Sequence, residues 1–178
     1  PVATYTAKVT KGQLWSLIGE SNVDKLSAAG DTVGSGSSAY TINKLEVYAD
    51  GRPVTTPAVS DYFANNSSAA AGSNSINDKA GKGVLTEVYQ DNDNNVTIVY
   101  VNTYVLQANG DYNESKGTLA VSNVTYPGSV TTLYDEDFDL SGIQDEDYIL
   151  VTASTSNGST YTVESAVKAE VVTGTVDA

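Results

Sequence analysis

Apolar and polar residues alternate along much of this chain with the two-residue period that is typical of β-strands. Residues 96–106 form a strong strand-like run of a different kind, because Val, Ile and Tyr occupy odd and even positions alike. A strand that is apolar on both faces is buried on both faces or lies in a curved sheet. We therefore expect residues 96–106 to form a central strand, or a strand bent around a barrel.

Shorter strand-like runs follow one another, separated by turn residues at intervals of about 8–12 residues. Asp50-Gly51 and residues 91–95 are predicted turns, because Asp, Asn and Gly tolerate the backbone conformations that turns require. This arrangement predicts a mostly β protein built from small antiparallel barrel or sandwich modules. The remaining predicted strands are Val2–Thr10, Thr41–Ala49, Gly83–Tyr89, Gly117–Tyr126, Val130–Tyr134, Tyr148–Ala153, Ser159–Val163 and Lys168–Val176.

Two segments depart from the strand pattern. Apolar residues between Gln13 and Leu26 have helical spacing, which predicts one short N-terminal helical element. Residues 65–75 are polar and of low complexity, so we expect a long loop there. These features suggest two parts: residues 1–80, an N-terminal β portion with the short helix and the long polar loop, and residues 81–178, a β-module of barrel or sandwich type.

The composition narrows the chemistry that the chain can perform. Its 178 residues include no His and no Cys, which removes the usual neutral-pH base, the thiolate nucleophile and the commonest transition-metal ligands. Asp and Glu number 22 against 9 Lys and Arg, a formal net charge of −13. Such a field repels nucleic-acid phosphates and anionic lipids and favours cations. We therefore expect no enzyme, no nucleic-acid partner and no membrane insertion.

The acidic residues are concentrated in one predicted connection. Asp135, Asp137, Asp139, Asp145 and Asp147 are candidate calcium ligands, because Ca²⁺ prefers carboxylate and carbonyl oxygens in loops. Their spacing does not match an EF-hand. The alternative is a solvated connection whose acids cap turns and keep the surface soluble. Beyond Ca²⁺, no cofactor is expected.

The 12 tyrosines and the paired acids leave two further functions open. Two carboxylates in a cleft can act on glycosides, and Tyr134 and Tyr148 flank the acidic connection as candidate stacking platforms. Trp15 and exposed tyrosines can also form a carbohydrate- or protein-binding face. The alternative is that tyrosines on strands pack against their cross-strand neighbours.

Three short motifs stand out in the second half of the chain: Val-Asn-Thr-Tyr at residues 101–104, Asp-Tyr-Ile-Leu-Val at 147–151 and Ala-Glu-Val-Val at 169–172. With them, residues 82–178 resemble the repeated β-modules of large Firmicutes surface proteins that carry S-layer homology domains. The resemblance implies an extracellular, cell-wall-associated segment of a longer protein. It brings no catalytic residues, and the chain contains no S-layer homology anchoring module itself.

The sequence thus predicts a non-catalytic structural or display module of a bacterial cell-surface protein of the S-layer type. The expected partners are neighbouring modules of the same parent protein or other cell-wall components, with a glycan as a further candidate. The alternatives are a carbohydrate- or protein-binding module and a carboxylate-based glycoside-acting enzyme.

Overall fold

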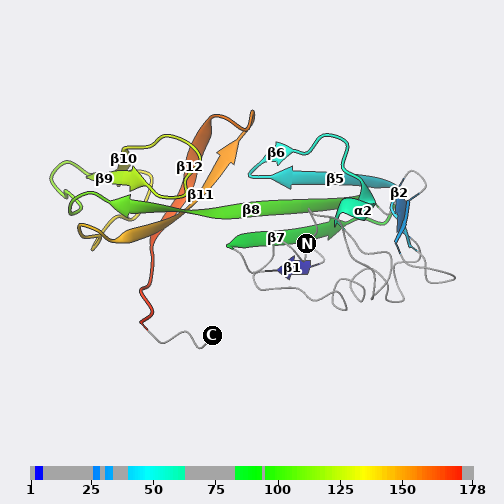
Figure 1. The fold of residues 1–178 in the computed structure, drawn as a ribbon, viewed down its shortest axis with the longest axis horizontal. Helices are drawn as coiled ribbons and strands as arrows, with labels where there is room; N and C mark the ends of the chain where they lie inside the picture. The colour runs from blue at the N-terminus through cyan, green and yellow to red at the C-terminus, as the bar shows by residue number, and fades with distance from the viewer. Residues whose placement is uncertain are drawn as a thin grey trace. The chain divides into compact units, whose positions relative to one another are not determined.

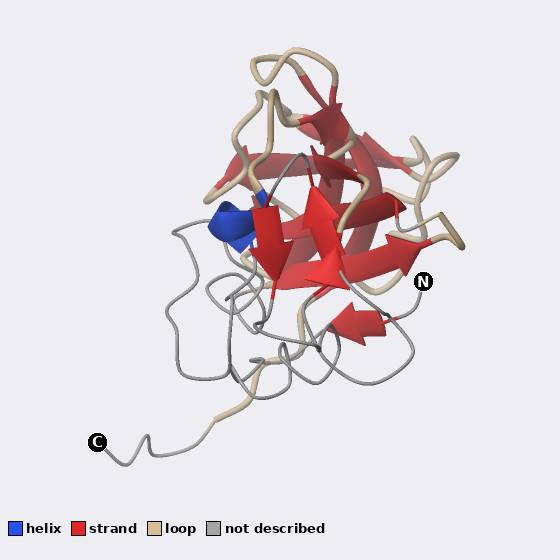
Figure 2. Cartoon of the chain, turned by 90° about the vertical axis from the view of Figure 1, so that its right-hand side faces the viewer, coloured by secondary structure: helices blue, strands red, loops and turns tan. Residues whose placement is uncertain are grey.

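The structure, a computed structural model, describes residues 3–5, 26–28, 31–33, 40–62, 83–93 and 95–173. The described residues lie mostly in β-strands, which confirms the predicted mostly β fold class. Among the described residues the one helix is α2 (Val59–Tyr62), which Figure 2 shows in blue beside the red strands. The helical element predicted at Gln13–Leu26 lies outside the described residues, except that Leu26 begins a strand. None of the described helical structure is long and apolar enough to cross a membrane.

The chain divides into two compact units, residues 1–102 and residues 103–178, called here the N-terminal and C-terminal units. The division falls inside the longest strand, β8 (Asn95–Ala108). It lies further along the chain than the boundary expected between residues 80 and 81. The two positions differ because β7 (Val84–Gln90) and the first half of β8 pair with strands of the N-terminal unit.

In the N-terminal unit, β8 is the central strand, with β7 on one side and β5 on the other (Figure 1). The β7–β8 pair is antiparallel, whereas β5 and β8 are parallel, unlike the purely antiparallel modules expected. A parallel pair needs a long crossover, and here α2 and β7 lie between the two strands in sequence. The other strands of this unit are β1 (Ala3–Tyr5), β2 (Leu26–Ala28), β3 (Asp31–Val33), β4 (Tyr40–Thr41), β5 (Lys44–Ala49) and β6 (Arg52–Pro53).

In the C-terminal unit, β8 is again central, and the strand order is β10-β9-β8-β11-β12. Every pair in this unit is antiparallel. The central position that the two apolar faces of residues 96–106 predict is therefore confirmed in both units. The remaining strands are β9 (Thr118–Asn123), β10 (Thr132–Tyr134), β11 (Tyr148–Thr155) and β12 (Tyr161–Lys168).

The last strand differs from the prediction. One strand, β12, replaces the two predicted at Ser159–Val163 and Lys168–Val176. β12 is antiparallel to β11, which begins at Tyr148, and the amide of Ala169 donates to the Tyr148 carbonyl at 2.8 Å. Past that bond β11 offers no further residue to pair with. The prediction is therefore wrong over residues 169–173, the described part of the expected strand beyond β12.

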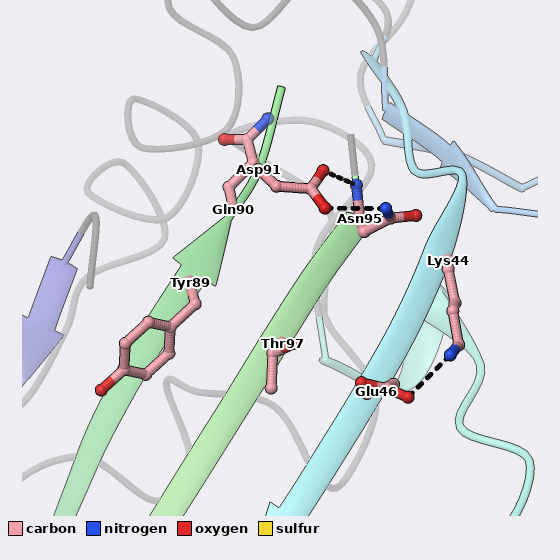
Figure 3. A pocket seen from close by; sticks show the side chains of 7 residues that line it. All are labelled: Lys44, Glu46, Tyr89, Gln90, Asp91, Asn95 and Thr97. Carbon is pink, nitrogen blue, oxygen red and sulfur yellow. Dashed lines mark hydrogen bonds and ion pairs between the residues drawn. The ribbon is translucent and has the colours of Figure 1, made fainter. Parts of the chain in front are cut away.

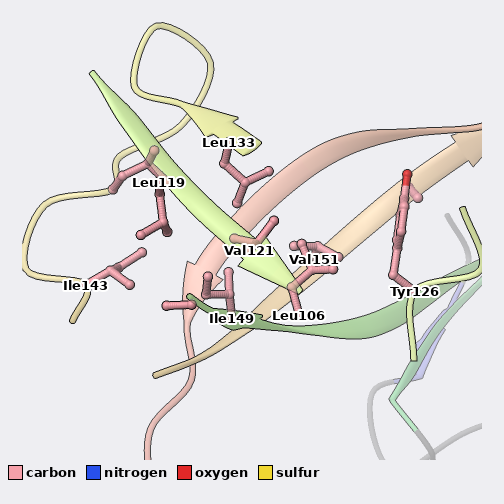
Figure 4. Close-up of a cluster of buried hydrophobic side chains, with 11 residues drawn as sticks. Leu106, Leu119, Val121, Tyr126, Leu133, Ile143, Ile149 and Val151 are labelled. Carbon is pink, nitrogen blue, oxygen red and sulfur yellow. The ribbon is translucent and has the colours of Figure 1, made fainter. Parts of the chain in front are cut away.

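Alternation along β8 decides which side chains enter the cores. The buried positions are all even-numbered: Val96, Ile98 and Tyr100 in the N-terminal unit, and Leu106 and Ala108 in the C-terminal unit. Burying one such large apolar side chain contributes about 1.5–3 kcal/mol. Figure 4 shows the core cluster of the C-terminal unit, to which strands and connections both contribute. Its buried members are Leu106, Ala108, Leu119, Val121, Tyr126, Leu133, Leu140, Ile143, Ile149, Val151 and Ala153.

Candidate functional site

The acidic connection, residues 135–147, joins β10 to β11, and it begins with a carboxylate that is built into a hairpin. Asp135 accepts a hydrogen bond from the Tyr112 hydroxyl at 2.6 Å, and this bond raises the pKa of Tyr112 to about 12. The backbone of Gly117 lies so close that a Cβ there would come within 2.5 Å of the Asp135 carboxylate. Asp135 therefore forms part of the packing of the β9–β10 hairpin.

Two further candidate ligands cap turns of the connection. Asp139 accepts from the Ser141 hydroxyl at 2.6 Å and from its amide at 3.1 Å. Asp147 accepts from the Gln144 amide at 2.8 Å and pairs with the Lys168 ammonium at 2.9 Å. The pKa of Asp139 is lowered chiefly by the Ser141 hydroxyl, and that of Asp147 chiefly by the Gln144 N–H and then by Lys168. Both turns are thus stabilised by the charged form of the acid.

Asp145 ties the connection to the end of β8. Its carboxylate accepts from the Gly110 amide at 2.7 Å, while its own amide donates to the Asp111 carboxylate at 2.8 Å. Next to this pair, the amide of Ala108 donates to the carbonyl of Asp147 at 2.8 Å. These bonds continue the contact between the two segments beyond the paired residues of β8 and β11.

Asp137 is the exception among the five candidates, because its carboxylate has no hydrogen-bond or ionic partner among the described residues. Within the described part of the chain, no three His, Cys, Asp or Glu side chains are grouped so that they could hold a metal ion. Four candidate ligands thus serve the protein's own turns and hairpins, and calcium binding stays a prediction. Those four are Asp135, Asp139, Asp145 and Asp147.

A buried acid has a similar role in the N-terminal unit. Asp50 and Gly51 have positive φ angles of 52° and 78° and join β5 to β6, which confirms the predicted tight turn. Asp50 is only 5% exposed, and its carboxylate accepts from the backbone amide of Asn102 at 2.9 Å and from its side-chain amide at 3.1 Å. Sequence reasoning assigned Asp50 to the turn alone, because nothing local indicates that Asn102 lies beside it.

One surface hollow in the described part of the chain, called here the polar hollow, lies on the sheet of the N-terminal unit and has a volume of about 320 Å³. Glu46 of β5 and Tyr89 of β7 are both register partners of Thr97 on β8. Figure 3 shows that the charged groups of this hollow have partners within the lining. Lys44 pairs with Glu46 at 2.8 Å, and Asp91 accepts hydrogen bonds from the side-chain and backbone amides of Asn95 at 2.8 and 3.0 Å. Its lining residues are Lys44, Glu46, Tyr89, Gln90, Asp91, Asn95 and Thr97.

The bonds of Asp91 also explain the turn between β7 and β8. Its carboxylate accepts from the amides of Asp93 and Asn95, and the Asn95 side chain and backbone together lower the pKa of Asp91. The predicted hairpin is confirmed, since β7 and β8 pair antiparallel up to Gln90 and Val96. This acid therefore supports a turn, as those of the acidic connection do.

The second hollow, called here the aromatic hollow, lies in the C-terminal unit and has a volume of about 170 Å³. Four aromatic rings and three aliphatic side chains line it, and Asp137 is its only ionisable carboxylate. The hydroxyls of Ser129 and Thr132 add two neutral polar groups. The lining residues are Tyr126, Ser129, Val130, Thr132, Leu133, Tyr134, Asp137, Phe138, Tyr161 and Val163.

Two rings of the aromatic hollow belong to a cluster of three tyrosines. Tyr104, Tyr126 and Tyr161 lie edge to face, with ring centroids 6.1–6.5 Å apart. Tyr126 is buried, which raises its pKa, and the backbone of Gly128 approaches its ring so closely that a Cβ there would lie 2.7 Å from it. Packing on several sides therefore holds this wall of the hollow in place.

The structure separates the two tyrosines that the sequence offers as platforms. Tyr134 lines the aromatic hollow and is 48% exposed, whereas Tyr148 is exposed on β11 and is absent from the lining. Sequence reasoning missed Tyr126, Phe138 and Tyr161 as members of one site. Their only common signal was the abundance of aromatic residues in predicted strands and turns.

Comparisons of the chain with protein-family models, with curated proteins and with solved structures find no match. The features that bear on function are therefore the acidic connection, the two hollows and the composition. Of the two hollows, the aromatic one contains an acidic group that the described residues leave without a partner.

Proposed function

We propose that the chain is a non-catalytic structural or display module of a bacterial cell-surface protein of the S-layer type. The observation that carries this proposal is how the acidic side chains are used. A carboxylate that transfers a proton or attacks a substrate must be free to reach it. Here Asp135, Asp139, Asp145 and Asp147 are hydrogen-bonded to the protein itself.

The distribution of charge supports the same proposal. Residues 103–178 carry 12 Asp and Glu and 2 Lys, a formal charge of −10 out of the total of −13. A surface this acidic stays hydrated and repels surfaces of the same sign, which suits a module exposed to solvent. Cationic groups on neighbouring modules or cell-wall components are the partners that its field favours.

A glycoside-acting enzyme has less support. It requires two carboxylates facing one cleft, about 5–10 Å apart. Glu46 and Asp91 both line the polar hollow, but each is already engaged by Lys44 or Asn95. The aromatic hollow holds only the carboxylate of Asp137. A binding module is the stronger second candidate, because the exposed ring of Tyr134, further aromatic rings and an acid without a described partner meet in that hollow.

Surface labelling tests the proposal. Antibodies raised against the chain are applied to intact and permeabilised cells that express the parent protein, before and after treatment with external protease. We expect intact cells to be labelled and the protease to remove the label. Labelling that requires permeabilisation and survives the protease would contradict a cell-surface role.

A further inference from the structure

The aromatic hollow differs from the polar hollow in what its polar groups contact. In the polar hollow, the acids Glu46 and Asp91 are paired with the neighbours Lys44 and Asn95. In the aromatic hollow, the carboxylate of Asp137 has no partner among the described residues. An unpaired carboxylate beside aromatic rings is the arrangement that attracts a cation, because ring faces and carboxylates are both negative.

The turn that carries Asp137 fixes where this acid lies. The amides of Asp137 and Phe138 both donate to the carbonyl of Tyr134, at 3.2 Å each, so the chain turns tightly just after β10. This turn brings the side chains of all three residues to one hollow, where the exposed ring of Tyr134 and the half-buried ring of Phe138 accompany the acid. Tyr161, packed edge to face on Tyr126, supplies a further wall from β12.

The size and lining of the hollow select among cations. Its volume of about 170 Å³ is below the range of roughly 300–1,000 Å³ that is usual for small-molecule pockets, so it suits one side chain better than a larger ligand. A lysine side chain combines a flexible four-carbon stem with a compact ammonium group of three donors. Apolar walls such as Val130 and Val163 suit the stem, and the oxygens of Asp137, Ser129 and Thr132 offer acceptors for the ammonium.

The charge of the unit complements such a ligand. A formal charge of −10 on residues 103–178 attracts cations over a distance of about one Debye length, roughly 8 Å at physiological salt. A neutral sugar gains nothing from this field. Of the two basic residues in the unit, Lys168 pairs with Asp147, and neither it nor Lys116 lines the hollow.

We propose that the aromatic hollow is a docking site for a lysine side chain presented by an exposed segment of a partner protein. The stem lies against the rings of Tyr134, Phe138 and Tyr161, and the ammonium contacts the carboxylate of Asp137. The proposed docking site does not depend on the proposed structural role, because a lysine side chain could bind in the hollow wherever the parent protein is located.

The test is a titration of the full-length ¹⁵N-labelled chain, followed by amide chemical shifts. The probe is the peptide acetyl-Gly-Ser-Lys-Ser-Gly-amide, and the control peptide has norleucine in place of lysine, which keeps the stem and removes the charge. We expect the lysine peptide to shift amides of residues 129–138 and 161–163 in a saturable manner. The norleucine peptide should bind at least about tenfold more weakly, since it lacks the charge-assisted hydrogen bond.

Two matched pairs of variants distinguish specific binding in the aromatic hollow from general electrostatic attraction of the lysine peptide to the acidic unit. Asp137→Asn and Glu136→Gln each remove one negative charge from the same turn, but only Asp137 lines the hollow. Tyr134→Leu and Tyr148→Leu each remove one exposed ring, and only Tyr134 lines the hollow. We expect Asp137→Asn to weaken the lysine peptide about tenfold, Tyr134→Leu to weaken it several-fold, and both control variants to change it less than twofold.

Three outcomes would overturn the proposal. They are equal weakening by Asp137→Asn and Glu136→Gln, equal binding of the lysine and norleucine peptides, and shifts of the same amides by a neutral hexose but not by the lysine peptide. Because the carboxylate of Asp137 has no partner among the described residues, we expect Asp137→Asn to fold normally. An unchanged amide spectrum of the free variant verifies this before the titration.

Discussion

Replacing Asp50 by Asn tests whether the acids of this protein stabilise its structure. Asp50 is the most buried described acid, and both of its carboxylate oxygens accept hydrogen bonds from Asn102. Asn keeps the shape of the side chain and tolerates the positive φ of this turn position. It can replace only one of the two acceptor oxygens, and it brings an NH₂ group to a position that faces a donor 3.1 Å away.

The expected loss follows from these two bonds. A hydrogen bond to a charged group contributes about 1.5–3 kcal/mol, and a neutral one about 0.5–1.5 kcal/mol. For Asp50→Asn, one bond becomes neutral, a loss of about 1–1.5 kcal/mol, and the other is lost, a further 1.5–3 kcal/mol, so the N-terminal unit should be destabilised by about 2.5–4.5 kcal/mol. With a urea m-value of about 1–2 kcal/mol/M, the unfolding midpoint should fall by more than roughly 1 M.

Urea unfolding followed by the amide NMR signals of β5 and β7 measures this change. Asp93→Asn is the matched control, because it removes the same charge from an exposed turn of the same unit, where the Asp93 side chain has no partner among the described residues. We expect the control to leave the midpoint within about 0.3 M of the parent protein. If Asp50→Asn and Asp93→Asn shifted the midpoint equally, the reasoning would be refuted.

Three further predictions concern stability. Gly117→Ala should destabilise the C-terminal unit by at least about 2 kcal/mol, since φ is +64° there and the new Cβ would meet Asp135; urea unfolding read from β9 signals measures it. Thr86→Val should stabilise the N-terminal unit by about 1 kcal/mol in the same assay, because the buried Thr86 hydroxyl has no hydrogen-bond partner among the described residues. A loss of stability of the same size would contradict this. Asp91, Asp139 and Asp147 have lowered pKa values in the folded protein, so their charged forms stabilise it above the unfolded pKa of about 3.9. This stability is lost as the pH falls through the lowered pKa values. The melting temperature, followed by circular dichroism, should therefore be steady from about pH 5 to 8 and decline below about pH 4.

Strands and tight turns could be predicted from the sequence because their signals are local. The apolar run over residues 96–106 predicts β8 and its central place, and Asp50-Gly51 predicts the turn that their positive φ angles confirm. The strand expected at Lys168–Val176 failed for a reason that is not local. Valines favour strands only where a partner exists, and β11 provides none beyond Tyr148.

The roles of the acids could not be predicted, because their partners are distant in the sequence. Asp135 contacts Tyr112, which is 23 residues away, and Asp145 contacts Gly110, which is 35 residues away. A cluster of acids looks the same in sequence whether it holds a cation or caps turns. Only the fold shows which carboxylate oxygens accept hydrogen bonds from the protein. Among the five candidate ligands, it shows that Asp137 alone has no partner among the described residues.

The central claim is that Asp139 and Asp147 stabilise turns of the acidic connection in their charged form, and we expect these two acids not to bind Ca²⁺. Carboxyl ¹³C NMR, titrated over pH with and without millimolar Ca²⁺, tests it most directly. We predict that Asp139 and Asp147 titrate below the ordinary Asp pKa of about 3.9, and that Ca²⁺ leaves their resonances unchanged. Ordinary pKa values, together with saturable Ca²⁺-induced shifts of these carboxyl groups, would contradict the account.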